Sequence, residues 1–370
     1  MADTSLVAAP VAASGRVLGS PDAVRAPQDL RGLHYPHGRW VPAAGAPFEV
    51  VPGVFWLRMP LPMGGLDHIN LWALADGDGW VLVDCGLNTE VSKALWEQML
   101  AGPLGGRPVR RVIVTHFHPD HIGLAGWLCA RWEVPLEMAR TEYLMARMLI
   151  GDAQPSPPDE VMAFYARAGW PEAALDALRG RSWGRYASLV GGLPGGFCRL
   201  QAGDVLDIGG RQWRIVVGRG HAPEHVCLVA DGVMISGDQV LPRITSNVSV
   251  HPTEPMANPL ADWLESIEAL RAIDAGALVL PAHNEPFVGL HVRLDQLAAD
   301  HQGKLADLRV ACAAPLSAFE SFPVLFRTPV SERDISIATG EALAHLHWLE
   351  AERQVRRVVG ADGVDRFLAV

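Results

Sequence analysis

Thr115-His116-Phe117-His118-Pro119-Asp120-His121 carries three imidazoles and one carboxylate within six consecutive residues. The run Arg111-Val112-Ile113-Val114 comes directly before it, and a β-branched run that stops at a polar cluster is typical of a buried strand ending in a loop. A helical pattern of apolar residues resumes at Ile122. The seven residues are therefore predicted to span a turn between a strand and a helix.

The spacing inside this turn indicates a metal site. His116 and His118 alternate along the chain, so an extended backbone directs both side chains to one side. Asp120 and His121 follow on the turn, where they can face a second point in the same cavity. Burying four such side chains without partners would be costly. We therefore expect a site for two metal ions whose remaining ligands come from elsewhere in the chain.

Four further polar residues each follow a strand-like run, and they are Asp84, His221, Asp238 and His283. Strand ends at one edge of a sheet hold side chains rigidly. Imidazole and carboxylate ligands without thiolate suit zinc, iron or manganese. Because a carboxylate can bridge two cations, Asp238 is the natural shared ligand. Two ions about 3.5–4 Å apart would hold a bridging hydroxide, which is a nucleophile at neutral pH.

Apolar patterns elsewhere predict two groups of strands separated by a helical region. The first group comprises strands at 54–59, 69–75, 80–84 and 108–115, with a helix at 89–100. The second comprises strands at 204–208, 212–217, 226–230, 233–235 and 277–280, with a helix at 259–272. Strands that alternate with helices in this way predict an α/β architecture.

Changes in composition divide the chain into three parts. Residues 1–47 are rich in Ala, Pro and Gly and are expected to form an N-terminal arm. Residues 48–290 are expected to form one catalytic domain with a mainly helical insertion at 140–197. Residues 291–370 show two helices followed by a β-hairpin, which predicts a small winged-helix-like domain.

Charge and cysteine content limit the classes of function. The 370 residues carry a formal net charge of −10, which argues against a nucleic-acid surface. Residues 291–370 hold nine Lys or Arg against eleven Asp or Glu, so packing or contact within a homodimer is a better expectation for them than DNA binding. Five cysteines without a CxxC pair fit reduced thiols in the cytoplasm. No apolar run reaches transmembrane length, so no membrane partner is expected.

Five short motifs carry a resemblance to a known family, and they are VDCG at 83–86, THFHPDHIG at 115–123, GH at 220–221, SGD at 236–238 and PAH at 281–283. Together they resemble the metallo-β-lactamase superfamily over about residues 50–290. The resemblance implies a four-layer αβ/βα sandwich with the metals at one edge of two sheets. The C-terminal tail is similar to that of superfamily hydrolases related to β-lactamase-like protein two.

The same resemblance implies a role for each ligand. One divalent ion, most simply zinc, would be held by His116, His118 and His221, and a second by Asp120, His121 and His283. Asp238 would bridge the two ions, and Asp120 could assist proton transfer while it remains a ligand, so these two are the expected catalytic residues. Asp84 would orient the ligands through its carboxylate, with Thr115 as a supporting hydrogen-bonding residue.

Residues that contact the substrate are harder to predict. The loop after Asp238 must begin near the metals, so Arg243 could meet a substrate carboxylate or phosphate, with a surface ion pair as the alternative. Asn247 lies on the same loop. His68 could border the cavity or simply begin a strand. Met and aromatic side chains in the insertion could form an apolar lid, although most are expected to pack in its own core.

The leading hypothesis is a dinuclear metal-dependent hydrolase acting on a small molecule with an apolar part. The bond would be a thioester, lactone or carboxylic ester. Hydrolysis of β-lactams, as main or side activity, is one alternative, and a mononuclear iron dioxygenase acting on a persulfide is another. A DNA-binding regulator that uses the C-terminal tail is a third alternative, which the acidic balance of that tail disfavours.

Overall fold

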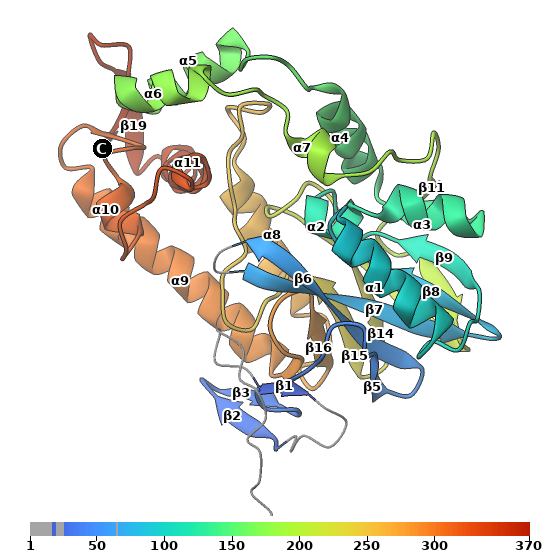
Figure 1. The fold of residues 1–370 in the computed structure, drawn as a ribbon. Coiled ribbons are helices and arrows are strands. Elements are labelled where there is room, and N and C mark those ends of the chain that lie inside the picture. The colour runs from blue at the N-terminus through green and yellow to red at the C-terminus, as the bar shows by residue number, and fades with distance from the viewer. Residues whose placement is uncertain (1–16, 20–25, 64–65) are drawn as a thin grey trace, which may run out of the picture.

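The computed structural model describes residues 17–19, 26–63 and 66–370. Two β-sheets pack face to face, and helices cover their outer faces (Figure 1). This is the four-layer αβ/βα sandwich that the family resemblance implies.

The first sheet has seven strands in the order β11-β10-β9-β8-β7-β6-β5. Their bounds are β5 Phe48–Val51, β6 Val54–Met63, β7 Leu66–Asp76, β8 Gly79–Val83, β9 Val109–Ile113, β10 Leu136–Met138 and β11 Cys198–Arg199. Helices α1 (Glu90–Ala101) and α3 (Ala125–Trp132) pack on its outer face. The short helix α2 (Pro119–Ile122) follows β9 and carries part of the ligand cluster.

The second sheet has eight strands in the order β12-β13-β14-β15-β16-β17-β3-β2. Their bounds are β2 Gln28–Leu30, β3 Leu33–Tyr35, β12 Val205–Ile208, β13 Arg211–Gly218, β14 His225–Ala230, β15 Val233–Gly237, β16 Leu278–Pro281 and β17 Phe287–Val288. Helices α8 (Pro259–Leu270) and α9 (Leu290–Ala311) lie on its outer side.

Strand alternation explains why both sheets are built from nearly continuous apolar runs. In β8, Val81 and Val83 face the second sheet, whereas Leu82 faces the helices. In β15, Ile235 faces the first sheet and Met234 faces α8 and α9. A strand that is buried on both faces needs an apolar residue at every position. These strands therefore form a rigid centre for whatever lies at their ends.

Part of the segment that was expected to form an N-terminal arm instead forms strands of the sandwich. Strands β2 and β3 extend the second sheet, and β1 (Val17–Gly19) pairs with β4 (Trp40–Pro42). These strands have only three residues each, which is too short to show a period in the sequence. Residues 1–16 and 20–25 of the expected arm lie outside the described residues. The proposed division into three domains stays a prediction.

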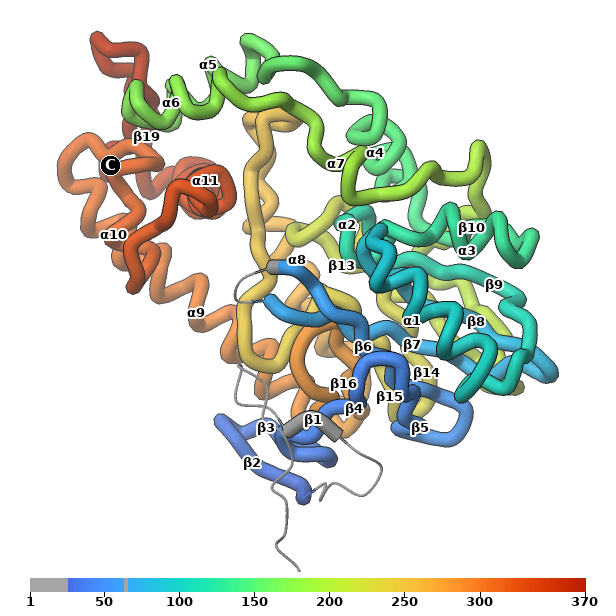
Figure 2. Tube along the Cα trace, in the orientation of Figure 1, coloured from blue at the N-terminus to red at the C-terminus, as the bar shows by residue number. Residues whose placement is uncertain are grey.

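The insertion is helical as expected, with α4 Arg140–Gly151, α5 Asp159–Arg167, α6 Glu172–Arg179 and α7 Tyr186–Leu189. After α9, the C-terminal part contains β18 Leu316–Ser317, α10 Phe322–Leu325, α11 Ile335–Ala351 and the hairpin β19 Val355–Val359 with β20 Asp365–Ala369. Figure 2 shows α5 and α6 reaching across to this C-terminal part. An ion pair of 2.9 Å joins Arg167 to Asp365 there. No helix among the described residues is both long and apolar enough to cross a membrane.

Candidate metal centre

Parallel strand pairs bring the predicted ligands to one edge of the sandwich. Strands β8 and β9 run parallel, as do β15 and β16, so the carboxyl ends of each pair meet. Asp84 follows β8 and the histidine cluster follows β9, while Asp238 follows β15 and His283 lies just beyond β16. The crevice beyond the carboxyl ends of strands is a common place for a functional site in α/β proteins.

Glycines precede two of the ligands for a steric reason. Gly220 before His221 has φ +98°, and a Cβ there would lie 2.5 Å from the Cβ of Trp263. Gly237 before Asp238 has φ +50°, and a Cβ there would lie 2.6 Å from the ring of His225. Only glycine tolerates both the left-handed backbone and the close approach. The GH and SGD motifs therefore combine a ligand with the turn that aims it.

The seven predicted ligands converge in two groups. Ligand atoms of His116, His118, His221 and Asp238 lie within 4.8 Å of one another, and so do those of Asp120, His121 and His283. In the first group, His116 Nε2 lies 2.8 Å from His118 Nδ1 and 3.3 Å from His221 Nε2. In the second, His283 Nε2 lies 3.4 Å from Asp120 Oδ2. Every residue chosen from the sequence as a ligand is present at this centre.

The carboxylate of Asp238 faces both groups. Its Oδ2 lies 3.4 Å from His221 Nε2 and 3.5 Å from His121 Nε2. Its Oδ1 lies 3.3 Å from His283 Nε2. One carboxylate thus lies within reach of histidines of each group, as a shared ligand must.

Asp84 and Thr115 orient the cluster from behind. Asp84 has a left-handed backbone, with φ 63°, and its carboxylate accepts hydrogen bonds from the Thr115 backbone N–H at 2.8 Å and from the Thr115 hydroxyl at 3.0 Å. The second carboxylate oxygen lies 2.7 Å from His121 Nδ1. This contact leaves Nε2 of His121 facing the centre. Carboxylate–histidine contacts of this kind orient metal ligands and raise their basicity.

Two backbone carbonyls orient two other histidines. His221 Nδ1 lies 2.8 Å from the carbonyl oxygen of Asn247, and His283 Nδ1 lies 2.9 Å from that of His68. A carbonyl oxygen only accepts, so each Nδ1 must carry the hydrogen. In the neutral form of either ring, the Nε2 lone pair is therefore the one that faces the centre and can bind a cation.

Electrostatics at the centre favour positive charge in one half. Burial alone would lower the pKa of His283, but the carboxylates of Asp238 and Asp120 raise it to about 10. Burial would also lower the pKa of His121. The surrounding carboxylates of Asp84, Asp120 and Asp238 outweigh it and hold this pKa well above its usual value. By contrast, burial lowers the pKa of His118 to about 3, so this imidazole is neutral at pH 7 and can act as a ligand.

Two buried atoms at the centre show that the residues fit bound cations. Within the described residues, His121 Nε2 and Asp238 Oδ1 form no hydrogen bond of good geometry, and their nearest polar contacts are the longer ion-pair distances of 3.5 Å to Asp238 Oδ2 and 3.3 Å to His283 Nε2. Buried polar atoms normally have a partner, so this pair of exceptions requires an explanation. Imidazole nitrogens and carboxylate oxygens in a dry setting are the donors that zinc and related divalent ions take. The donor set therefore fits one cation in each group.

The three residues expected to contact substrate have other partners. The Arg243 guanidinium forms an ion pair of 2.9 Å with the fully buried carboxylate of Glu285. His68 is buried, and its ring accepts from the Asn284 N–H at 2.9 Å. The side chain of Asn247 accepts a hydrogen bond from Ser249. The structure thus gives Arg243 a structural ion pair, and His68 and Asn247 support the ligands through their carbonyls.

Two residues that were not among the predicted site residues support the ligand loops. Glu142 of α4 is buried, and its carboxylate accepts from the backbone N–H of Phe117 at 2.9 Å and of Glu224 at 2.6 Å. His225 is buried and accepts from the Asp238 N–H at 3.0 Å, and its ring stacks on His116 at 4.7 Å. A glutamate on an amphipathic helix carries no sign of such contacts. His225 lies only four residues beyond His221, and this spacing could have indicated from the sequence that it lies near the centre.

Family models match most of the chain. The model described as the metallo-beta-lactamase superfamily matches residues 64–283, and the model of the metallo-beta-lactamase-like C-terminal domain matches residues 305–370. The first match includes all seven predicted ligands and Asp84.

Similar proteins agree with these matches. A crystal structure of a beta-lactamase domain protein from Burkholderia ambifaria is 46% identical, has a TM-score of 0.85, and the alignment covers 91% of this chain and 98% of that one. A metallo-beta-lactamase family protein from Thermus thermophilus is 26% identical, with a TM-score of 0.72 and coverage of 87% and 100%. The probable metallo-hydrolase YqjP of Bacillus subtilis is 26% identical over 310 residues, which are 82% of this chain and 93% of that protein.

Proposed function

The chain belongs to the metallo-β-lactamase superfamily and is a metal-dependent hydrolase, and we propose that it uses two divalent cations to cleave an ester-type bond. The substrate would be a thioester, a lactone or a carboxylic ester with an apolar part. One observation carries the dinuclear proposal. The Asp238 carboxylate lies 3.4 Å from His221 of the first ligand group and 3.3 Å from His283 of the second.

We propose zinc as the metal because of the donor count. His116, His118, His221 and Asp238 offer four donors, which matches the tetrahedral preference of zinc. Two cations at this centre would supply a nucleophilic hydroxide at neutral pH and positive charge for the oxyanion that develops on an attacked carbonyl. Hydrolysis of an ester consumes only water besides the ester, so it requires neither an oxidant nor a further co-substrate.

The chain's own residues supply position and proton transfer. Burial raises the pKa of the Asp120 carboxyl, but His121 and His283 outweigh it and hold the value at about 2. Asp120 is therefore ionised at neutral pH, as a metal ligand must be, and we propose that it assists proton transfer while it remains a ligand. Asp84 and the carbonyls of Asn247 and His68 keep the imidazoles aligned. We further propose that the enzyme acts in the cytoplasm on a small molecule and that it forms a homodimer.

Metal content combined with a substrate panel tests this function. Elemental analysis of the purified protein should find about two zinc ions per chain. The panel should contain an acyl thioester, a lactone, an aryl ester, a phosphodiester and a β-lactam, and the first three should be hydrolysed with the highest kcat/KM. One iron per chain with oxygen uptake on a persulfide would refute the proposal, and a β-lactam as the best substrate would replace its ester part.

A further inference from the structure

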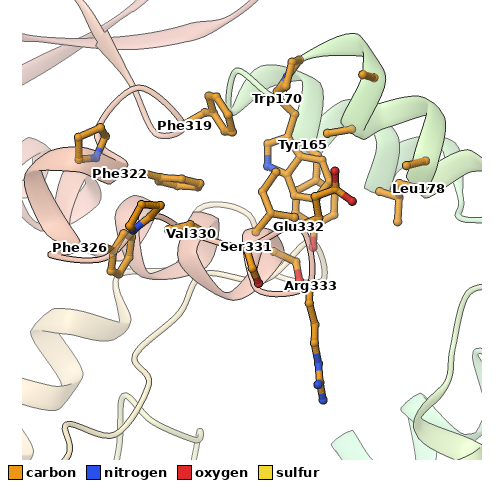
Figure 3. Close-up of a pocket in the computed structure, with 18 of the residues that line it drawn as sticks. Tyr165, Trp170, Leu178, Phe319, Phe322, Phe326, Val330, Ser331, Glu332 and Arg333 are labelled. Carbon is orange, nitrogen blue, oxygen red and sulfur yellow. The ribbon is translucent and has the colours of Figure 1, made fainter. Parts of the chain in front are cut away.

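A large cavity lies between the helical insertion and the C-terminal part, away from the ligand cluster (Figure 3). Helices α5 and α6 form one wall, and α10 with residues 326–336 forms the other. Its volume is about 810 Å³, within the ~300–1,000 Å³ of small-molecule pockets. None of the seven metal ligands lines it. The cavity is therefore a site distinct from the metal centre.

Aromatic rings line the cavity from both walls. Tyr165 and Trp170 face Phe319, Phe322 and Phe326 across it (Figure 3). The rings of Tyr165 and Trp170 lie 4.2 Å apart, and that of Phe322 lies 5.1 Å from Phe319 and 5.7 Å from Phe326.

Two polar contacts outside the cavity attach the wall formed by α5 and α6 to the C-terminal part. The Trp170 indole N–H donates to the Thr339 hydroxyl at 2.8 Å, and Arg167 pairs with Asp365 at 2.9 Å. A preformed apolar cavity loses less conformational freedom when it binds an apolar group. These rings therefore provide a built surface for an apolar chain or ring.

Three arginines accompany the aromatic walls. Arg181, Arg327 and Arg333 line the cavity and are exposed, and within the described residues none of them has an ion-pair partner. Arg167 and Arg179, on the neighbouring helices, do have acidic partners. Arg333 extends away from the rings in Figure 3. The lining contains one acidic residue, Glu332, against the three arginines.

Charge and shape together define the ligand. The chain as a whole has a net charge of −10, whereas the side chains that line the cavity have a net positive charge. Guanidinium groups bind carboxylates through paired, geometrically matched hydrogen bonds. We propose that this cavity binds a small amphiphilic carboxylate, with its apolar part among the rings and its anionic head at the arginines. The proposal stands apart from the proposed hydrolytic activity, since it needs neither metal nor turnover.

Calorimetric titration of the full chain with decanoate tests the proposal, and decan-1-ol serves as the uncharged probe. Decanoate should bind with one molecule per chain. In Arg327→Gln/Arg333→Gln its affinity should fall about tenfold, because two charges that meet the carboxylate are removed, while decanol binding should not change. The double variant Arg309→Gln/Arg356→Gln is the matched control. It removes two exposed charges that do not line the cavity and should bind decanoate like the wild type.

Two further variants locate the binding. Ala174→Trp places a large ring in the cavity and should weaken decanoate and decanol together. Asp238→Ala, which disrupts the metal centre, should still bind decanoate and so excludes a carboxylate bound to metal. Loss of binding in Asp238→Ala, or wild-type affinity in Ala174→Trp, would overturn the proposal. Equal binding of both probes, with no effect of the arginine substitutions, would overturn its anionic part.

Discussion

The metal centre and the aromatic cavity are built in opposite ways. At the metal centre, charged and polar side chains follow rigid strands, and His121, His221 and His283 are oriented by a carboxylate or a backbone carbonyl. At the cavity, helices from the insertion and the C-terminal part present aromatic rings, and the charged groups are exposed arginines. The centre suits a reaction that needs fixed geometry, whereas the cavity suits recognition by shape and charge.

The difference shows which kind of site a sequence reveals. The ligands of the metal centre form short motifs at strand ends, so they can be recognised from the amino-acid sequence alone. The cavity residues lie in two segments, 165–183 and 319–336. The first contains the end of α5 and α6, the second contains α10 and the start of α11, and neither carries a motif. Substitutions can test whether the two regions are as separate as their construction implies.

The largest effect is expected from the Asp238 carboxylate, which lies within 3.5 Å of histidines of both ligand groups. Asp238→Ala should lose metal and should lower kcat/KM by at least ~10³-fold, because the charge that lies between both groups is removed. Elemental analysis and the rate on the best substrate measure this effect. Asp231→Ala, an exposed aspartate on the turn before β15, is the control. Unchanged turnover in metal-free Asp238→Ala would sink the metal mechanism.

Glu142 tests whether the insertion supports the centre. Burial raises the pKa of its carboxyl to about 7 from an ordinary value of 4.5. Between these two pH values the folded protein binds a proton that the unfolded chain has released, so the free energy of unfolding falls as pH rises. The fall should reach up to about 3 kcal/mol. Glutamine does not titrate, so Glu142→Gln should lack this contribution.

Urea denaturation of chelator-treated protein at pH 5 and pH 8 measures the Glu142 effect. The wild type should lose stability relative to Glu142→Gln between the two pH values. Glu160→Gln, an exposed change on α5, should follow the wild type. Parallel pH profiles for wild type and Glu142→Gln would show that this carboxyl is already ionised in the folded protein at pH 5.

Asp84 should have a smaller effect on metal affinity. Asp84→Asn replaces one acceptor oxygen by an amide that cannot accept from Thr115 or His121, so metal affinity should fall about 10–100-fold. Competition with a chelator of known affinity measures the change. Asp307→Asn, an exposed substitution on α9, controls for the loss of charge. Wild-type affinity in Asp84→Asn would mean that packing alone aligns His121.

The smallest effect is expected at Asn247. Its backbone carbonyl, not its side chain, meets His221, so Asn247→Ala should keep kcat/KM within about twofold. Measuring kcat and KM of Asn247→Ala on the best substrate of the panel tests this prediction. A tenfold rise in KM with unchanged kcat would restore Asn247 as a substrate contact and move the substrate site to this loop.

Much of the fold was predictable because burial on both faces leaves a continuous apolar run in the chain. The strands predicted at 69–75, 80–84 and 226–230 match β7, β8 and β14 closely. The three-residue strands β2 and β3 were missed because so short a run has no period. The helices of the insertion were predicted, but the part of the molecule that they cover was not.

The sequence by itself indicated the candidate ligands that the structure gathers in two groups, because a ligand's chemistry belongs to its side chain and its position is set by the strand just before it. Only the tertiary structure decided how those ligands are supported. The carbonyls of His68 and Asn247 act through a group that every residue has, and Glu142 reaches Phe117 across 25 positions. Arg243 pairs with Glu285 for the same reason, since such contacts depend on how distant segments pack. The aromatic cavity exists only because the insertion and the C-terminal part meet.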